Sequence, residues 1–235
     1  MTRGGRLLVI DTATTRAVIA VGEADGALVA ERNWVAGYRH GEELLARLES
    51  LLADCGMTLA DLGAIVTGTG PGAFTGLRVG IATAKGLAHA ARLPIVGIST
   101  GTALLEAVRI ADGAIDAIGG RLVLLQPAGQ SDRVVTRPGL GSVIVAGGVE
   151  PVLAPDERLV AVDLEGRAPV AAVALGETAY AGLAGALLGA GAARLAAGDT
   201  DDLAGLVPEY VTLPRGVLAA LPDSAVDISG GMARP

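Results

Sequence analysis

The sequence predicts an α/β protein built on a mixed sheet with helices on its faces. Two observations lead to this fold class. Over about the first 110 residues, short apolar runs and amphipathic stretches follow one another in the order βββαβαβα, and 51% of the 235 residues are hydrophobic. Helical crossovers imply parallel pairing of the later strands, whereas a hairpin between the second and third strands implies an antiparallel edge.

Each element of the first half is predicted from a local pattern of apolar and turn residues. The turn signal Asp25-Gly26 joins the second and third strands as a hairpin. Leu44, Leu48 and Leu51 give the first helix its amphipathic spacing, and Gly56 ends it. The expected strands are 6–10, 17–21, 27–34, 64–67 and 95–98, and the expected helices are 42–54, 75–91 and 100–110.

The second half contains five strand candidates and one long helix. The strands are expected at 114–118, 121–125, 133–136, 142–145 and 159–162, and the helix from Pro169 to about Leu188. We expect a boundary between two structural units near residue 110. From Asp223 on, the chain mixes Gly, Pro, Ser and charged residues, which predicts a loose tail.

One stretch of the long helix raises the question of a membrane span. Thr178–Ala193 contains no charged residue, but it is shorter than the roughly 20 residues that a span requires. Tyr180, Leu183 and Leu187 share one helical face, so we expect a core helix.

Charge and composition argue against several classes of function. With 18 basic and 25 acidic residues, and Lys85 as its one lysine, the chain is a poor candidate for gripping nucleic acid directly. His40 and His89 lie far apart in sequence, with no His or Cys partner at ligand spacing, so no metal site is expected. Cys55 is interpreted as an inert thiol, and Asp201-Asp202 as a solvated helix end.

Two segments have residues suited to contact an anion. Asp11-Thr12-Ala13-Thr14-Thr15 follows a strand, so its carboxylate and hydroxyls could hold a magnesium-bound phosphate or satisfy the backbone of their own turn. In Gly68–Gly80 (GTGPGAFTGLRVG), glycines and Thr75 lead into a helix N-terminus. Arg78 could clamp an anion or form a surface ion pair. Anion contact and a purely structural bend remain equally open, and neither a P-loop nor a catalytic constellation is present.

Four stretches resemble the TsaB (YeaZ) family of bacterial tRNA threonylcarbamoyladenosine proteins: LLVIDTATTRAVIAV, HGEELLARLESLL, GTGPGAFTGLRVGIATAKGLA and LPIVGIST. The resemblance covers roughly residues 6–105. The family pattern GPGSFTGLRIG is the most specific part, and here Ala73 and Val79 replace its serine and isoleucine. Further on, 114–117 stand where the family has a D-A-R segment, with Ile118 in place of the arginine, and Pro208-Glu209-Tyr210 is similar to the family's P-x-Y.

The resemblance implies an actin/hexokinase/Hsp70-like (ASKHA) fold with two βββαβαβα-type lobes, the second reduced. The expected division is 1–110 for the first lobe, 111–222 for the second and 223–235 for the tail. Ala13 stands where ATPases of this superfamily commonly have glycine, and the H-x-x-x-H motif of TsaD is missing, which together imply a non-catalytic paralogue. Its vestigial phosphate contacts would be Asp11, Thr12, Thr14, Gly70, Gly72, Thr75 and Arg78.

The resemblance also implies partners. The family pairs with TsaD, which transfers a threonylcarbamoyl group to N6 of adenosine 37 in tRNAs reading ANN codons, and a TsaE-type ATPase assists. We therefore expect a cytoplasmic heterodimer, a homodimer when alone, contact with tRNA only through the complex, no membrane, and ATP and metal on the partner subunits. The expected interface residues on the first two helices are Glu43, Leu44, Arg47, Ala82, Ala84, Lys85 and Ala88, although packing on the chain's own sheet is equally open for the small ones.

Two other functions were weighed against the scaffold. One is a small ATP-dependent phosphotransferase of the same superfamily, with Asp11 and Thr14 at the phosphates. The other is a peptidase-like or protease-regulating protein, for which the sequence supplies neither a nucleophile nor a zinc site. The scaffold is the preferred hypothesis.

Overall fold

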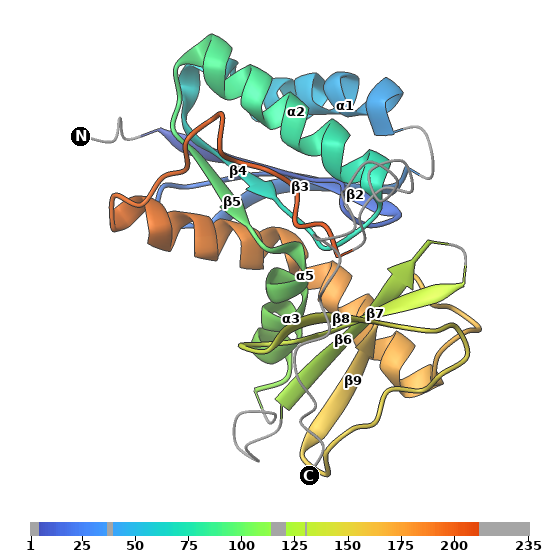
Figure 1. Ribbon diagram of the computed structural model, residues 1–235. Coiled ribbons are helices and arrows are strands. Elements are labelled where there is room, and N and C mark those ends of the chain that lie inside the picture. Colours follow the sequence, from blue (N-terminus) through green and yellow to red (C-terminus); the bar gives the residue numbers. More distant parts are fainter. Residues whose placement is uncertain (1–4, 37–39, 114–120, 130, 212–235) are drawn as a thin grey trace, which may run out of the picture.

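A computed structural model of the chain (Figure 1) describes residues 5–36, 40–113, 121–129 and 131–211. In the described residues, the first lobe contains a five-stranded sheet, three α-helices and one short 3₁₀ helix. Its strands are β1 (Arg6–Asp11), β2 (Arg16–Gly22), β3 (Leu28–Val35), β4 (Leu62–Gly68) and β5 (Ile95–Ile98). Its helices are α1 (His40–Asp54), the short 3₁₀ helix η1 (Leu59–Asp61), α2 (Phe74–Ala91) and α3 (Thr100–Ala111).

The first sheet has the strand order β3-β2-β1-β4-β5. β1 is antiparallel to β2 and parallel to β4, and β5 continues the parallel part. The predicted mixed sheet with its antiparallel hairpin edge is therefore confirmed. The bounds of these elements agree with the expected ones to within two residues, and η1 was not predicted.

The alternation of side chains along β1 divides the first lobe into two cores. Leu8 and Ile10 point to the face that α1 and α2 cover, and Leu7 and Val9 to the opposite face. Figure 1 shows α1 and α2 above the sheet and the long helix α5 (Val170–Ala196) below it. Because both faces are covered, residues 7–10 of β1 and 62–66 of β4 are apolar and buried.

The second sheet repeats part of this arrangement. Its strands β6 (Arg121–Ala128), β7 (Asp132–Arg137), β8 (Gly141–Val145) and β9 (Glu157–Ala161) have the order β8-β7-β6-β9. β6 is antiparallel to β7 and parallel to β9, as β1 is to β2 and β4. The strand expected at 114–118 lies outside the described residues. The other four predicted strands are present.

α5 joins the two lobes, and its predicted end near Leu188 is wrong. The helix continues to Ala196, and its glycines let it pack closely on the first sheet instead of ending it. A Cβ on Gly191, for example, would lie 2.4 Å from Cγ2 of Val66 on β4. Among the described residues, α5 is the helix long and apolar enough to cross a membrane. Its Tyr180, Leu183 and Leu187 are buried with α3 and the first sheet, so it is the core helix that we expected.

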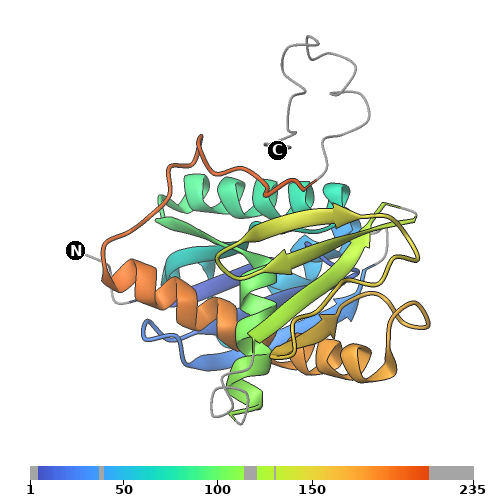
Figure 2. The same ribbon diagram turned by 60° about the horizontal axis from the view of Figure 1, so that its bottom comes forward.

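After α5 the chain returns to the first lobe (Figure 2). Asp201 pairs with Ile95 of β5, and its carboxylate accepts hydrogen bonds from the Gly97 amide at 2.7 Å and from Arg194 at 3.0 Å. The interpretation of Asp201-Asp202 as a solvated helix end is therefore wrong for Asp201. Leu206 is buried in the core beneath α1 and α2. The boundary near residue 110 separates the two sheets, while residues 199–211 pack on the first one.

Candidate functional site

The turn between β1 and β2 places Asp11 in the interior of the protein. Its side chain is fully buried, where Oδ2 accepts a hydrogen bond from Oγ1 of Thr100 at 2.6 Å and Oδ1 accepts one from the Ala13 amide at 3.0 Å. Burial raises the pKa of this carboxyl, and the two hydrogen bonds oppose that rise. Asp11 therefore links the end of β1 to the start of α3.

Thr12 and Thr14 are also turned inward and are 2% exposed. Oγ1 of Thr12 donates to the Gly76 carbonyl in α2 at 2.7 Å, and Oγ1 of Thr14 donates to the Arg16 carbonyl at 2.8 Å. These hydroxyls satisfy the backbone of their own surroundings, the second of the two roles open to them. Phosphate contact by Asp11, Thr12 and Thr14 stays a prediction.

The glycine-rich loop fits against this turn without space for side chains. A Cβ on Gly68 would lie 1.6 Å from Oδ2 of Asp11, and one on Gly72 would lie 2.0 Å from the Ala13 carbonyl oxygen. Gly70 has a φ of 107° and precedes a cis bond to Pro71. The loop is also hydrogen-bonded to its neighbours, because the Gly70 amide donates to Thr100 at 3.1 Å. The close packing and the positive φ of Gly70 explain these glycines by the structure of the loop itself.

The other predicted phosphate contacts lie at the surface around the N-terminus of α2. Gly72, Thr75 and Arg78 are exposed. The Arg78 guanidinium stacks 3.8 Å from the centroid of the Phe74 ring, and its Nε donates to the Tyr210 hydroxyl at 3.0 Å. Arg78 thus links Tyr210 to α2 and, among the described residues, does not form the surface ion pair, the alternative role considered for it, while anion contact by Arg78 stays a prediction.

A hydrogen-bonded junction that the sequence analysis missed joins the same turn to the second lobe. Asp163, directly beyond the end of β9, accepts hydrogen bonds from the Thr15 amide at 2.8 Å and the Tyr180 hydroxyl at 2.5 Å. Arg16 pairs with Glu177 at 2.5 Å, and its guanidinium lies 4.3 Å from the Tyr180 ring centroid. Burial and the Asp163 charge raise the pKa of Tyr180. The partners are about 150 residues apart in sequence, so no local motif indicates them.

Three of the seven predicted interface residues are corrected by the structure. Leu44, Ala84 and Ala88 are buried beneath α1 and α2, at 1% or less exposure, because these positions face the chain's own sheet. Packing on the sheet, the alternative left open for the two alanines, applies to them. Their side chains are therefore unavailable to a partner.

The remaining four interface candidates are partly or fully exposed. Glu43 and Arg47 form an ion pair at 2.8 Å along α1, and Lys85 donates to the Leu206 carbonyl at 3.1 Å. Ala82 is exposed, and so is Gly86 one turn later on α2. Among the residues that the structure describes, no group of three or more acidic, His or Cys side chains could hold a metal ion.

Comparison with known proteins identifies relatives of this arrangement. A family model described as TsaD, tRNA N6-adenosine threonylcarbamoyltransferase, matches residues 34–154, just over half of the chain. The Escherichia coli protein TsaB is 40% identical over 95 residues, which are 40% of each chain. The tRNA N6-adenosine threonylcarbamoyltransferase of Sphingopyxis alaskensis is 31% identical over 230 residues, 85% of this chain and 65% of the relative.

Other matches show how far the similarity reaches. An uncharacterized protein of Mycobacterium tuberculosis is 37% identical over 118 residues, and the chain thus spans about half the length (49%) of that curated relative. The structure of YeaZ from Pseudomonas aeruginosa aligns with a TM-score of 0.63 at 23% identity, covering 88% of this chain and 99% of the other. The expected α/β fold is confirmed as that of YeaZ, and the second lobe is reduced to a four-stranded sheet.

The family match, the TsaB relatives from three bacteria and the YeaZ-like fold agree with the resemblance in the glycine-rich loop. The chain therefore belongs to the family of TsaD and TsaB (YeaZ) proteins of tRNA threonylcarbamoyladenosine biosynthesis.

Proposed function

We propose that this chain is a non-catalytic scaffold subunit that activates a TsaD-type transferase by forming a heterodimer with it. The transferase places a threonylcarbamoyl group on N6 of adenosine 37 in tRNAs that read ANN codons. In this proposal ATP and metal belong to TsaD and a TsaE-type ATPase, and the chain contacts tRNA only indirectly, through the complex. The complex forms in the cytoplasm, and the chain alone forms a homodimer.

One observation carries the non-catalytic part of the proposal. Asp11 and Thr14, which a phosphotransferase would need at the phosphates, are buried and hydrogen-bonded within the chain. A phosphate would have to displace the Thr100 hydroxyl from Asp11 and open the packed turn, leaving buried polar groups without partners. This cost favours the scaffold over the phosphotransferase.

The scaffold surface is assigned to the outer faces of α1 and α2. Ala82 and Gly86 lie one turn apart on α2 and are exposed, so a partner helix could approach the backbone closely there. On the neighbouring helix α1, the apolar side chain of Leu45 is 57% exposed. These small or apolar positions lie on two helices that contact each other, and a helical partner bound to both helices would bury them.

Mass measurement by light scattering tests the proposal. The chain would be measured alone, mixed with the TsaD protein of the same genome, and as the variants Ala82→Trp and Ala181→Trp. Ala181 is an exposed alanine on α5 and serves as the matched control. We expect a one-to-one complex for the parent and the control. Ala82→Trp should weaken it at least about tenfold, since a bulky side chain prevents close helix approach.

Two results would contradict the proposal. The first is a mixture in which the chain keeps its own mass at about 10 μM of each protein, because complexes with a micromolar Kd are well populated there. The second is saturable Mg-ATP binding with turnover by the chain alone, measured by calorimetry and phosphate release, which would favour the phosphotransferase. A complex of parental affinity in Ala82→Trp would exclude the surface around Ala82 as the interface.

A further inference from the structure

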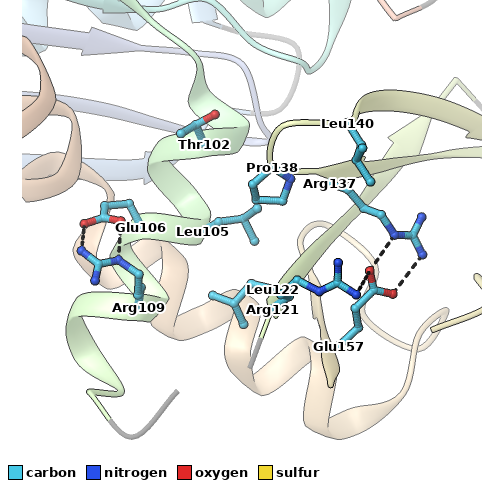
Figure 3. Close-up of a pocket in the computed structure, with 10 residues that line it drawn as sticks. All are labelled: Thr102, Leu105, Glu106, Arg109, Arg121, Leu122, Arg137, Pro138, Leu140 and Glu157. Atoms are coloured by element: carbon cyan, nitrogen blue, oxygen red, sulfur yellow. Dashed lines mark hydrogen bonds and ion pairs between the residues drawn. The ribbon is translucent and has the colours of Figure 1, made fainter. Parts of the chain in front are cut away.

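A cavity of about 290 Å³ lies between the two lobes, away from the β1–β2 turn and from the α1–α2 surface. Its walls come from α3 on one side and from β6, β7, β9 and the β7–β8 turn on the other (Figure 3). Its volume is close to the lower limit for small-molecule sites, about 300 Å³. The cavity is therefore suited to a small ligand.

The inner surface of the cavity is apolar. Leu105 on α3 and Leu122 on β6 are largely buried, at 5% and 7% exposure, and form the floor. Pro138 and Leu140 belong to the β7–β8 turn and form the opposite wall. Leu140 is 77% exposed, so a ligand lying against it would remove apolar surface from water.

Three arginines surround this apolar surface, and they are held in two different ways. Arg137 is fixed, because its Nε donates to Oε1 of Glu157 at 2.9 Å and the Glu157 carboxylate is 6% exposed. The arginine and the Ala154 amide lower the pKa of Glu157 to about 2, so this pair stays charged at neutral pH. Arg137 and Glu157 thus form a rigid part of the wall.

Arg109 and Arg121 are instead at the rim, with side chains 47% and 59% exposed. Each pairs with an exposed carboxylate, Arg109 with Glu106 at 2.6 Å and Arg121 with Asp156 at 2.8 Å. Each of these arginines donates to both oxygens of its carboxylate, and Arg121 also lies 4.0 Å from Oε1 of Glu157. Because water reaches these pairs, an anionic ligand can replace a carboxylate here at a smaller cost than in the Arg137–Glu157 pair. Figure 3 shows Arg109 beside Glu106 on α3, and Arg121 next to Leu122, with its guanidinium toward Glu157.

We propose that this cavity binds a small organic anion, whose apolar body lies between Leu105 and Leu140 and whose charged head pairs with Arg121. The planar guanidinium group can bind a carboxylate or a phosphate head through paired hydrogen bonds. The apolar floor requires an aryl or branched aliphatic body. The proposal does not depend on the scaffold function, because no residue of the α1–α2 surface lines the cavity.

Binding of four simple probes to the full chain tests this inference by isothermal titration and by NMR shift mapping. Phenylacetate and phenyl phosphate carry both features, acetate lacks the apolar body, and phenylacetamide lacks the charge. We expect saturable binding of at least one aryl anion below about 1 mM. We expect binding about tenfold weaker for the amide and for acetate. Comparing phenylacetate with phenyl phosphate identifies the preferred head group.

Three variants locate the site. Arg121→Gln removes a rim cation and Leu140→Ser removes exposed apolar surface, and each should weaken the aryl anion about five- to tenfold. Arg158→Gln is the matched control, since Arg158 follows Glu157 on β9, is similarly exposed and paired, and does not line the cavity. It should bind as the parent does. Equal binding of phenylacetate and phenylacetamide, unchanged binding in Arg121→Gln, shifts mapping elsewhere, or no saturation up to about 10 mM would each overturn the proposal.

Discussion

The two sheets share a strand order but differ in how they are covered. In the first lobe, helices connect β3 to β4 and β4 to β5, and both faces of the sheet are buried. In the second, residues 146–156 connect β8 to β9 without a helix. Six exposed aliphatic side chains lie in the β7–β8 turn, in β8 and in this connection: Leu140, Val143, Ile144, Val149, Val152 and Leu153. Strand order thus survives where helical cover is lost, and the shared helix α5 supplies part of the missing cover.

The first strands of the two lobes, β1 and β6, each carry a buried polar side chain near their end, and the two differ in their hydrogen bonding. Asp11, the last residue of β1, has hydrogen-bond partners for both carboxylate oxygens. Gln126 near the end of β6 is also buried, but its Nε2 makes one long bond of 3.4 Å to the Pro71 carbonyl, and its Oε1 has no partner among the described residues. The first lobe's turn is therefore a tight structural element, whereas Gln126 of the second lobe is held by a single long hydrogen bond to the glycine-rich loop.

The largest expected effect tests the tightness of the first turn. Gly68→Ala should destabilise the chain by about 3 kcal/mol or more, because the new Cβ would overlap the buried Asp11 carboxylate. Gly189→Ala is the control, at an exposed helical position with nothing within 4 Å, and should stabilise by about 0.5–1 kcal/mol. Urea unfolding measures both. A Gly68→Ala protein as stable as the parent would refute the tight turn.

A matched pair of core truncations tests whether the lobes unfold together. Val66 and Val123 are fully buried in the first and second sheets. Each Val→Ala change should cost about 2 kcal/mol and shift one common transition, because α5 packs against both lobes. Calorimetry and denaturant unfolding followed by two probes measure this. Two separate transitions, with only one moved by Val123→Ala, would show independent lobes.

The buried carboxyl of the first turn should make stability depend on pH. Because burial raises the folded pKa of Asp11 above its ordinary 3.8, the folded state binds more protons than the unfolded state above that pH. Asp11 therefore contributes to the free energy of unfolding at low pH, and this contribution is lost as pH rises through the folded pKa. The loss is about 1.4 kcal/mol per unit of difference between the folded and unfolded pKa. Asp11→Asn should lose this dependence. Parallel unfolding curves of parent and variant from about pH 4 to pH 8 would contradict it.

The smallest expected effect concerns the ion pair of the second lobe. Since the folded pKa of Glu157 is lowered from 4.5 to about 2, its contribution to stability is present above 4.5 and is lost as pH falls toward 2. Glu157→Gln should lower the Tm at neutral pH by less than Val123→Ala does, and the difference should close near pH 2. Thermal melts at both pH values measure it. A difference that persists in acid would assign the loss to packing instead of charge.

The candidate site was predictable only in part. The residues of the β1–β2 turn and the glycine-rich loop stood out in the sequence, because a carboxylate, three threonines and closely spaced glycines have few roles outside tight turns and anion sites. Which of these roles applies depends on distant residues such as Thr100, whose hydroxyl occupies Asp11. The Asp163 junction gave no local signal, and the interface prediction included Leu44, Ala84 and Ala88 because helical spacing alone does not say which face meets the sheet.

The sequence by itself determined the α/β class, the order of elements in the first lobe, the strand positions from β6 to β9 and the family, because apolar periodicity and a specific glycine pattern are local properties of the chain. Tertiary structure decided the end of α5, the return of residues 199–211 to the first sheet, the inward orientation of Asp11, and the cavity between α3 and the second sheet. The physical reason is the same in each case. Burial and hydrogen bonding depend on the partner that folding brings into contact, and for these residues that partner is far away in the sequence.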